Sequence, residues 1–380
     1  MNNGAMKISK NDALLWFDHF AGRDEDAEVS VRDQEIAYAV VAQIEAAVDQ
    51  RHNALIAKIK NLKHLEHRTL YVGNPDKFPG GCKSCLLGSG MGAIRKTNTC
   101  NVRCKFCYNY GEMDKIPPVG EGMWEIGGTR FYAKDLDLLL SIQQKPSGVS
   151  YVFLEPFMEI EKYYPIIKKF RPTGIHQHLY TNGLLANESN LRALGEAGLD
   201  ELRFNLGAAK CADQVIENIR IAKKYIPSVG IETPMTPEFY AGFRKKKAAI
   251  LATGLDFMNC AELHLNPNNI DNYAGENLYM CRQGYISPLW SRELTLQLMK
   301  QADDEAWDLA VHDCSNHTKF ARGLNLGAKE GKHFGASSSY ACEFPVLPFE
   351  AFFPVLNDED FPFLCEEELP PAYRPPLLEY

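Results

Sequence analysis

The sequence predicts an α/β fold in which short parallel strands alternate with helices. Two observations carry this prediction: apolar, strand-like runs recur from residue 93 onward, and a helical pattern separates each run from the next. Such alternation implies parallel βαβ units with right-handed crossovers. The expected strands are residues 93–97, 149–154, 175–181, 201–206, 229–232 and 261–265, and the expected helices are residues 133–144, 160–170, 188–197, 212–225 and 236–252.

An N-terminal extension precedes this core, which we place at residues 81–267. Residues 1–80 are expected to be mainly helical, because Ile36, Val40 and Ile44 recur on one face at helical spacing. These apolar positions are expected to form packing surface for the core.

A C-terminal extension, residues 268–380, follows the core and mixes several patterns. A helix is expected near residues 291–306 and one more strand at residues 308–312, while residues 344–380 are rich in proline and aromatics. We expect this mixed extension to close one end of the core.

The composition limits the compartment and the partners of the chain. Its 380 residues carry a net charge of −8 without a long block of one sign, so a nucleic-acid partner is not expected. The sequence shows neither an N-terminal signal segment nor an apolar run long enough for a bilayer, so we expect a cytoplasmic protein without membrane contact. In a reducing cytoplasm, the clustered ones among the eleven cysteines are expected to be metal or cluster ligands rather than disulfides, whereas Cys211 is expected to be a small core residue.

Three closely spaced cysteines form the most informative motif. Cys100, Cys104 and Cys107 follow the first expected strand with the spacing C-x3-C-x2-C. Three thiolates can hold three irons of a [4Fe–4S] cube and leave the fourth iron open to a substrate or cofactor. The motif therefore predicts an iron–sulfur centre with an open iron.

A structural zinc ribbon is the competing interpretation of the same region. Cys82 and Cys85, together with Cys104 and Cys107, form C-x2-C-x18-C-x2-C. This interpretation gives no role to Cys100 and does not explain the strand–helix alternation that follows.

The cysteine motif and the six strand–helix units resemble the radical S-adenosylmethionine (SAM) superfamily. Within it, the segments Tyr180-Thr181-Asn182-Gly183 and Gly198 to Asn205 resemble relatives of pyruvate formate-lyase activating enzyme. The resemblance implies a partial (β/α)6 TIM-like barrel that holds a [4Fe–4S] cluster and SAM. It also implies reductive cleavage of SAM to a 5′-deoxyadenosyl radical, with electrons from an external donor such as flavodoxin or ferredoxin.

The expected cofactor contacts lie at the C-terminal ends of the strands, where functional groups of β/α barrels gather. After the second strand, many superfamily members have Gly-Gly-Glu-Pro, whereas this chain has Phe153-Leu154-Glu155-Pro156 and keeps only the last two residues. The resemblance implies the following contacts with the cofactors: Phe106, Tyr108, Glu155, Thr181, Asn182, Arg203, Asn205, Glu232 and His264.

Several of these residues also have simpler explanations. Asn182 precedes a glycine, a pair typical of a turn. Arg203 and Asn205 share one face of a strand, which is either the barrel interior or the side covered by a helix. His264 could equally be a buried core residue with satisfied hydrogen bonds.

The remaining cysteines suggest a second metal centre, either an iron–sulfur cluster or zinc. A second cluster needs about four ligands, and Cys82 and Cys85 with Cys281 and Cys342 would supply them. The later cysteines lack the C-x2-C pairing of common auxiliary-cluster domains.

Two residues are candidates for the group that donates a hydrogen atom to the substrate. Cys314 lies in a dense polar run directly after a possible strand, and Tyr340 lies close to Cys342. The alternative explanation for both is ordinary packing in loops.

The expected activity is hydrogen abstraction from a small-molecule or amino-acid-like substrate. One alternative is modification of a peptide or protein, including activation of a glycyl-radical enzyme. A second alternative is a non-catalytic iron–sulfur or zinc protein.

Overall fold

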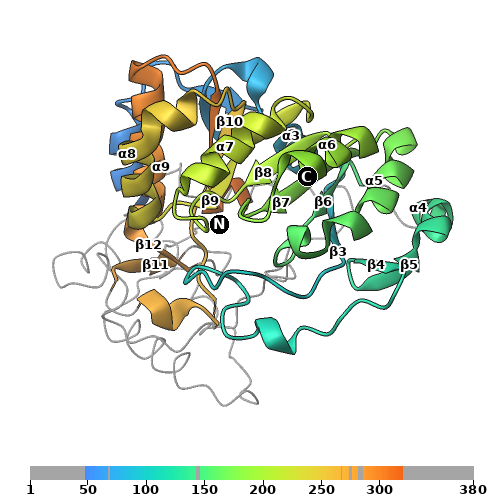
Figure 1. The fold of residues 1–380 in the computed structure, drawn as a ribbon. Helices are drawn as coiled ribbons and strands as arrows, with labels where there is room; N and C mark the ends of the chain where they lie inside the picture. The colour runs from blue at the N-terminus through green and yellow to red at the C-terminus, as the bar shows by residue number, and fades with distance from the viewer. Residues whose placement is uncertain are drawn as a thin grey trace, which may run out of the picture.

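A large mixed sheet forms the centre of the molecule in the computed structural model (Figure 1). The sheet has eleven strands in the order β1-β2-β13-β10-β9-β8-β7-β6-β3-β4-β5. The structure describes residues 48–66, 69–142, 146–266, 268–273, 276–280 and 286–319.

The middle of the sheet is parallel. Each of the strands β3, β6, β7, β8, β9, β10 and β13 runs parallel to the next in that order, so strands that follow one another are neighbours. These strands are β3 (Met91–Arg95), β6 (Gly148–Tyr151), β7 (His176–Thr181), β8 (Glu201–Phe204), β9 (Ser228–Pro234), β10 (Phe257–Ala261) and β13 (Ala310–Cys314). The predicted parallel α/β core is confirmed.

Antiparallel strands border the parallel core on both sides. A hairpin of β4 (Met123–Ile126) and β5 (Thr129–Tyr132) pairs with β3. On the other side, β1 (Lys63–Leu65) and β2 (Thr69–Gly73) continue the sheet beyond β13. A separate two-stranded sheet joins β11 (Leu278–Met280) and β12 (Ile286–Pro288).

The helices that connect the strands follow one another in the order of those strands (Figure 1). Capping residues mark the ends of some of these helices, as α6 shows. Asn187 caps α6 through the backbone N–H of Asn190, and Gly198 ends this helix in the left-handed conformation. The helices are α3 (Gly80–Leu87), α4 (Leu136–Ile142), α5 (Tyr164–Phe170), α6 (Glu188–Ala197), α7 (Asp213–Ala222), α8 (Pro237–Leu251) and α9 (Leu289–Asp304).

Two expectations for the elements differ from the structure. Residues 63–65 and 69–73 are strands within the stretch expected to be helical, because they gain hydrogen bonds from each other and from β13, which lies far away in the sequence. The last expected strand, residues 261–265, is shifted: β10 ends at Ala261, and His264 lies in the loop beyond it. Residues 1–47 and 320–380 of the two expected extensions lie outside the described part.

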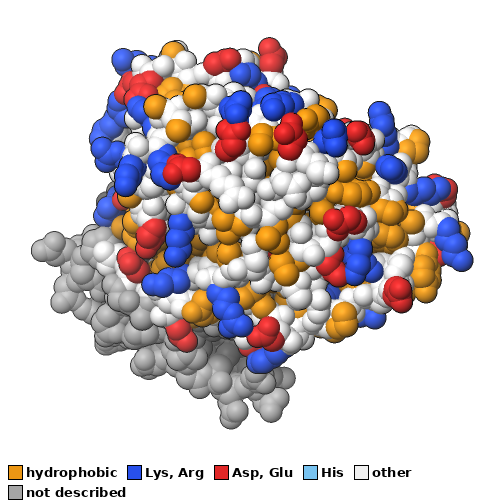
Figure 2. All heavy atoms as spheres, in the orientation of Figure 1, with side chains coloured by type: hydrophobic (Ala, Val, Ile, Leu, Met, Phe, Trp, Pro, Cys, Tyr) orange, Lys and Arg blue, Asp and Glu red, His pale blue; other side chains and the backbone are white. Residues whose placement is uncertain are grey.

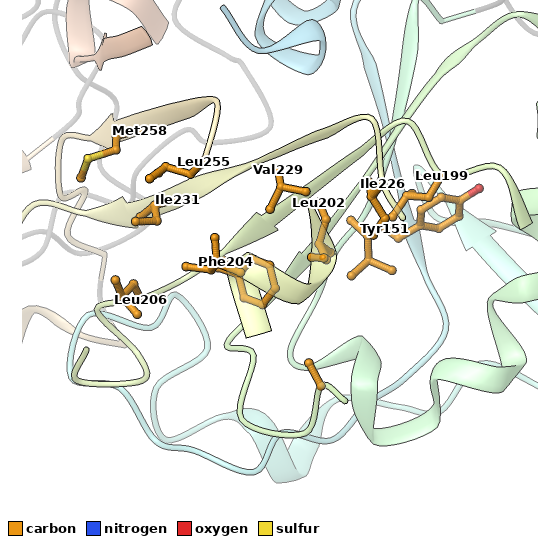
Figure 3. Packing of buried hydrophobic residues seen from close by; sticks show 14 of the residues in the cluster. Tyr151, Leu199, Leu202, Phe204, Leu206, Ile226, Val229, Ile231, Leu255 and Met258 are labelled. Carbon is orange, nitrogen blue, oxygen red and sulfur yellow. The ribbon is translucent and has the colours of Figure 1, made fainter. Parts of the chain in front are cut away.

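The sheet has an apolar face and a polar face. Leu179 of β7 and Leu202 of β8 belong to a large buried core with residues of α5, α6 and α7. Figure 3 shows Leu202, Phe204 and Val229 from neighbouring strands lying together in this core. The alternate residues of the same strands face α3, which packs against β6 and β7.

Charges of both signs are mixed over the face of the molecule that Figure 2 shows. Within the described residues, no helix combines the length and the apolar character that crossing a membrane requires.

Candidate functional site

The three motif cysteines lie in one loop that follows β3, at the C-terminal edge of the parallel strands. All three side chains are half-buried, and the Cys107 N–H donates to the Cys104 carbonyl at 2.9 Å. Burial raises the pKa of the Cys104 thiol to about 12 and also raises the pKa of Cys100 and Cys107. Bound iron would supply the positive charge that stabilises thiolates here, so this donor set fits a cluster.

Four asparagines that follow β10, five strand positions away from β3 in the sheet, hold the backbone of the cysteine loop. Asn266, Asn268, Asn269 and Asn272, which we call the asparagine clamp, lie just after β10. The bonds run from Asn266 Nδ2 to the Tyr108 carbonyl (3.0 Å), from Asn268 Nδ2 to the same carbonyl (3.0 Å), from Asn269 Nδ2 to the Phe106 carbonyl (3.3 Å) and from Asn272 Nδ2 to the Lys105 carbonyl (2.9 Å). Side-chain amides thus fix the loop without contacting the thiols.

Sequence reasoning missed this clamp, apart from the position of Asn266 at a strand end. The signal was present as four asparagines within the seven residues 266–272. Such clusters are usually explained as turns, because asparagine side chains often bond to their own local backbone. Here the side-chain oxygens of Asn266 and Asn269 do accept from the local backbone, while the amide nitrogens also reach a distant loop.

Glu155 ties together the ends of two neighbouring strands. Its carboxylate accepts from Thr181 Oγ1 at 2.7 Å, from the Asn182 N–H at 2.7 Å and from the Phe157 N–H at 3.1 Å. Asn182 in turn donates its Nδ2 to Asn101 Oδ1 at 2.7 Å, which connects this turn to the cysteine loop. Glu155 is 1% exposed, so it positions the residues around it.

Burial raises the pKa of the Glu155 carboxyl from 4.5 to about 7, although its three hydrogen bonds oppose the rise. Between these values the folded chain holds a proton that the unfolded chain has released. The free energy of unfolding should therefore fall as pH rises from 4.5 to 7, by on the order of 3 kcal/mol. We expect Glu155→Gln to remove this dependence in urea unfolding measured at several pH values.

The exposed Glu161→Gln, on the same 3-10 helix η4 (Pro156–Lys162), serves as the control and should keep the wild-type pH profile. An unchanged profile in Glu155→Gln would mean that Glu155 does not titrate in this range.

The two residues before Glu155 have backbone dihedral angles typical of glycine, although neither residue is glycine. Phe153 has φ of 78° and Leu154 has φ of 52°, both in the left-handed region that side chains disfavour. These two residues occupy the positions at which the resemblance led us to expect Gly-Gly. The turn that presents Glu155 is thus retained at the expense of strain.

Phe153→Gly should raise the free energy of unfolding by about 1 kcal/mol, because relief of strain outweighs the added chain entropy. Phe153 is 38% exposed, so little packing is lost. The matched control is Tyr132→Gly, an aromatic that is 44% exposed with an ordinary φ of −92°. Thermal unfolding should show that Phe153→Gly stabilises the chain and that Tyr132→Gly destabilises it. Equal destabilisation in both variants would contradict backbone strain at Phe153.

Arg203 lies on the polar face of the sheet, next to α3. It forms ion pairs with Glu201 and Glu232, and its Nη2 lies 3.6 Å from Cys82 Sγ. Arg203 is 2% exposed. Both carboxylates therefore contact a buried guanidinium that faces the interior of the fold.

Asn205, two residues beyond Arg203, accepts from Thr233 Oγ1 at 2.9 Å and from the Ala208 N–H at 3.0 Å. It joins the ends of β8 and β9, and we assign it a positioning role at this edge.

Tyr108 and His264 meet next to the cysteine loop. The Tyr108 hydroxyl hydrogen-bonds to His264 Nδ1, and the two rings pack edge to face with centroids 5.1 Å apart. Burial lowers the pKa of His264 to about 3, so its imidazole is neutral at physiological pH. Tyr108 remains 38% exposed and can contact a ligand above the loop.

Three further cysteines lie near one another on the polar side of the sheet. Cys82 and Cys85 lie on α3, and Cys314 lies at the end of β13. Burial raises the pKa of Cys314 to about 12, and the nearby Glu232 and Cys85 add to this rise. Cys281, Tyr340 and Cys342, which complete the expected auxiliary and catalytic sets, lie outside the described residues.

Two curated relatives of this chain are named as an activating enzyme and as a cofactor-modifying protein. A protein of Methanocaldococcus jannaschii named as a glycyl-radical enzyme activating enzyme is 30% identical over 213 residues, which cover 52% of this chain and 53% of that protein. The tungsten-containing aldehyde ferredoxin oxidoreductase cofactor-modifying protein of Pyrococcus furiosus is 24% identical over 202 residues. These residues cover 46% of this chain and 52% of that protein. The chain spans about half the length of these curated relatives. No protein-family model matches.

Among solved structures, Streptococcus suis SuiB bound to its precursor peptide SuiA aligns at 13% identity with a TM-score of 0.40, over 83% of this chain and 61% of SuiB. This likeness is too weak to carry an argument about function. The sequence relatives, by contrast, confirm the predicted resemblance to the radical SAM superfamily and to activating enzymes within it.

Proposed function

We propose that this chain is a radical SAM enzyme whose cluster ligands are Cys100, Cys104 and Cys107. The observation that carries the proposal is the cysteine loop itself. It places three thiols at the C-terminal edge of the parallel strands. The asparagine clamp bonds the backbone of the loop, and Asn182 bonds the Asn101 side chain within it. When bound, a [4Fe–4S] cluster with an open iron supplies the electron that cleaves SAM into methionine and a 5′-deoxyadenosyl radical.

The surrounding residues have separate tasks in this proposal. Thr181 and Asn182 form the turn that borders the cofactor, and Glu155 holds that turn in place. Phe106 and Tyr108 offer an aromatic wall beside the third cysteine. Enclosure of the site keeps water and other hydrogen donors away from a reactive radical.

A partial (β/α)6 barrel is the fold that we propose for residues 81–267. In a flat sheet, β10 would lie five strand spacings, about 24 Å, from β3. The loops that follow these two strands are nevertheless joined by the hydrogen bonds of the asparagine clamp. This contact supports a sheet that curves back toward itself.

Two classes of substrate fit the proposal. The name of the Methanocaldococcus relative favours activation of a glycyl-radical enzyme, in which a hydrogen atom is taken from a protein. A small-molecule or amino-acid-like substrate is favoured if the extensions outside residues 81–267 close the mouth of the barrel. In either case, an external one-electron donor such as flavodoxin or ferredoxin is required.

The test is anaerobic SAM cleavage. The chain reconstituted with iron and sulfide, reduced with dithionite and given SAM should yield 5′-deoxyadenosine by mass spectrometry. The variant with Cys100, Cys104 and Cys107 all replaced by alanine should yield none. A chain with an intact cluster that neither binds nor cleaves SAM would instead be a non-catalytic iron–sulfur protein, and one that binds only zinc would be a structural zinc protein.

A further inference from the structure

Two histidines and a glutamate meet near the amino ends of β7 and β8, the opposite edge of the parallel strands from the cysteine loop. His176 and His178 alternate along β7 and therefore point to the same face. Glu201 begins β8 and is the direct register partner of His178. One ligand atom from each of the three residues lies within 4.8 Å of the others.

The two imidazoles hold nitrogen atoms that are buried yet have no hydrogen-bond partner among the described residues. These atoms are His176 Nε2 and His178 Nδ1, and His178 as a whole is 2% exposed. A buried polar atom without a partner is costly, so its retention needs an explanation. Desolvation lowers the pKa of both imidazoles, and neutral imidazole is the form that binds metal.

The charges around these nitrogens act in both directions: Arg203 disfavours a positive charge on either imidazole, whereas Glu201 favours one on His176. Arg203 supplies one positive charge, and it is shared between Glu201 and Glu232. These three side chains together carry one net negative charge in a buried region. A cation bound by Glu201 and the two neutral imidazoles would offset that charge.

The first turn of α3 lies directly over the three side chains, and its first two residues, Gly80 and Gly81, are glycines. A Cβ on Gly81 would lie 2.4 Å from Arg203 Nη2 and 2.5 Å from His178 Nδ1, and a Cβ on Gly80 would lie 2.6 Å from the His176 ring. Any side chain at either position would press on the imidazoles. Because these two residues have no side chains, the helix can cover the site without pressing on the imidazole nitrogens.

We propose that His176, His178 and Glu201 form a binding site for a divalent first-row transition metal, with zinc as the ion that fits best. Two histidines and one carboxylate are a common protein ligand set for zinc, and a water completes the coordination. The site is separate from the cysteine loop and does not depend on the proposed SAM chemistry. All three ligands lie on β7 and β8, so the ion would join these two strands beneath α3, the helix that carries Cys82 and Cys85.

The experiment uses the full chain with Cys100, Cys104 and Cys107 replaced by alanine, so that no motif cluster competes for metal. Zinc is titrated against a chromophoric chelator, and the expected result is one bound equivalent. His176→Ala, which removes a partly exposed ligand with little loss of packing, should weaken zinc binding by about tenfold or more. The exposed His64→Ala is the matched control and should bind zinc as the parent does.

Cobalt gives a second readout that separates this site from the nearby thiols. A cobalt complex held by imidazole and carboxylate shows visible ligand-field bands without thiolate charge-transfer absorption, and His176→Ala should lose those bands. Failure of the folded parent to bind zinc would overturn the proposal. So would strong thiolate absorption, because the ion would then lie on Cys82 and Cys85.

Discussion

Replacement of Cys104 by alanine is expected to abolish stable cluster binding and, with it, SAM cleavage. The parent chain should bind about four irons on the motif cysteines. Two remaining thiols cannot retain a cube that already relies on only three protein ligands. Iron and sulfide analysis after anaerobic reconstitution, with the visible absorption of the cluster, measures the loss.

The matched control for this variant is Cys211→Ala. Cys211 is a fully buried cysteine outside the motif, and its Sγ packs against Gly242 of α8. Its alanine variant should keep the iron content and the activity of the parent. This comparison separates loss of a ligand from general loss of a thiol.

Alanine variants of Cys82 and Cys100 distinguish the cluster from the zinc ribbon. A ribbon made by Cys82, Cys85, Cys104 and Cys107 would lose its metal in Cys82→Ala and would not respond to Cys100→Ala. The cluster interpretation predicts the reverse: Cys100→Ala would lose the iron bound by the motif, and Cys82→Ala would keep it. Full iron content in Cys100→Ala would therefore remove the basis of the proposed function.

The second large effect is expected from Arg203→Met, which should lower the free energy of unfolding by about 3–5 kcal/mol. Methionine keeps much of the apolar stem of the side chain but removes the charge. Glu201 and Glu232 would then share a buried region without the guanidinium that pairs with both. Urea unfolding of the full chain measures the change.

Arg220→Met is the control for this prediction, because Arg220 pairs with Glu217 on the exposed face of α7. Surface pairs of this kind contribute little, so its unfolding midpoint should stay close to that of the parent. If Arg203→Met were equally mild, the two carboxylates would have to take up protons on loss of the arginine, and its stability would then rise toward acidic pH.

Periodicity in the sequence was enough to predict the parallel core. The strand-like runs at 149–154, 175–181 and 201–206 are separated by helical patterns, and they overlap β6, β7 and β8. The hairpin of β4 and β5 could not be predicted in this way. Its residues, including Trp124 and Phe131, are buried only because β3 and the core lie beside them.

The site was predictable where chemistry shows in the residue type and hidden where it depends on long-range contacts. The cysteine spacing marked the loop without help from structure. Glu155 was expected to face the cofactor, yet it is buried beneath the turn, since its partners Thr181 and Asn182 come from the next strand. His176 and His178 looked like ordinary strand residues until β8 placed Glu201 beside them.

The asparagine clamp also sets an order of events during biosynthesis. The amides that hold the cysteine loop come 158 to 167 residues later in the chain than the carbonyls they bind. The motif cysteines therefore leave the ribosome long before their loop can be fixed, because distant contacts form only when the intervening chain has folded. We expect iron and sulfide to be inserted after translation, into a body that already has β10 in place.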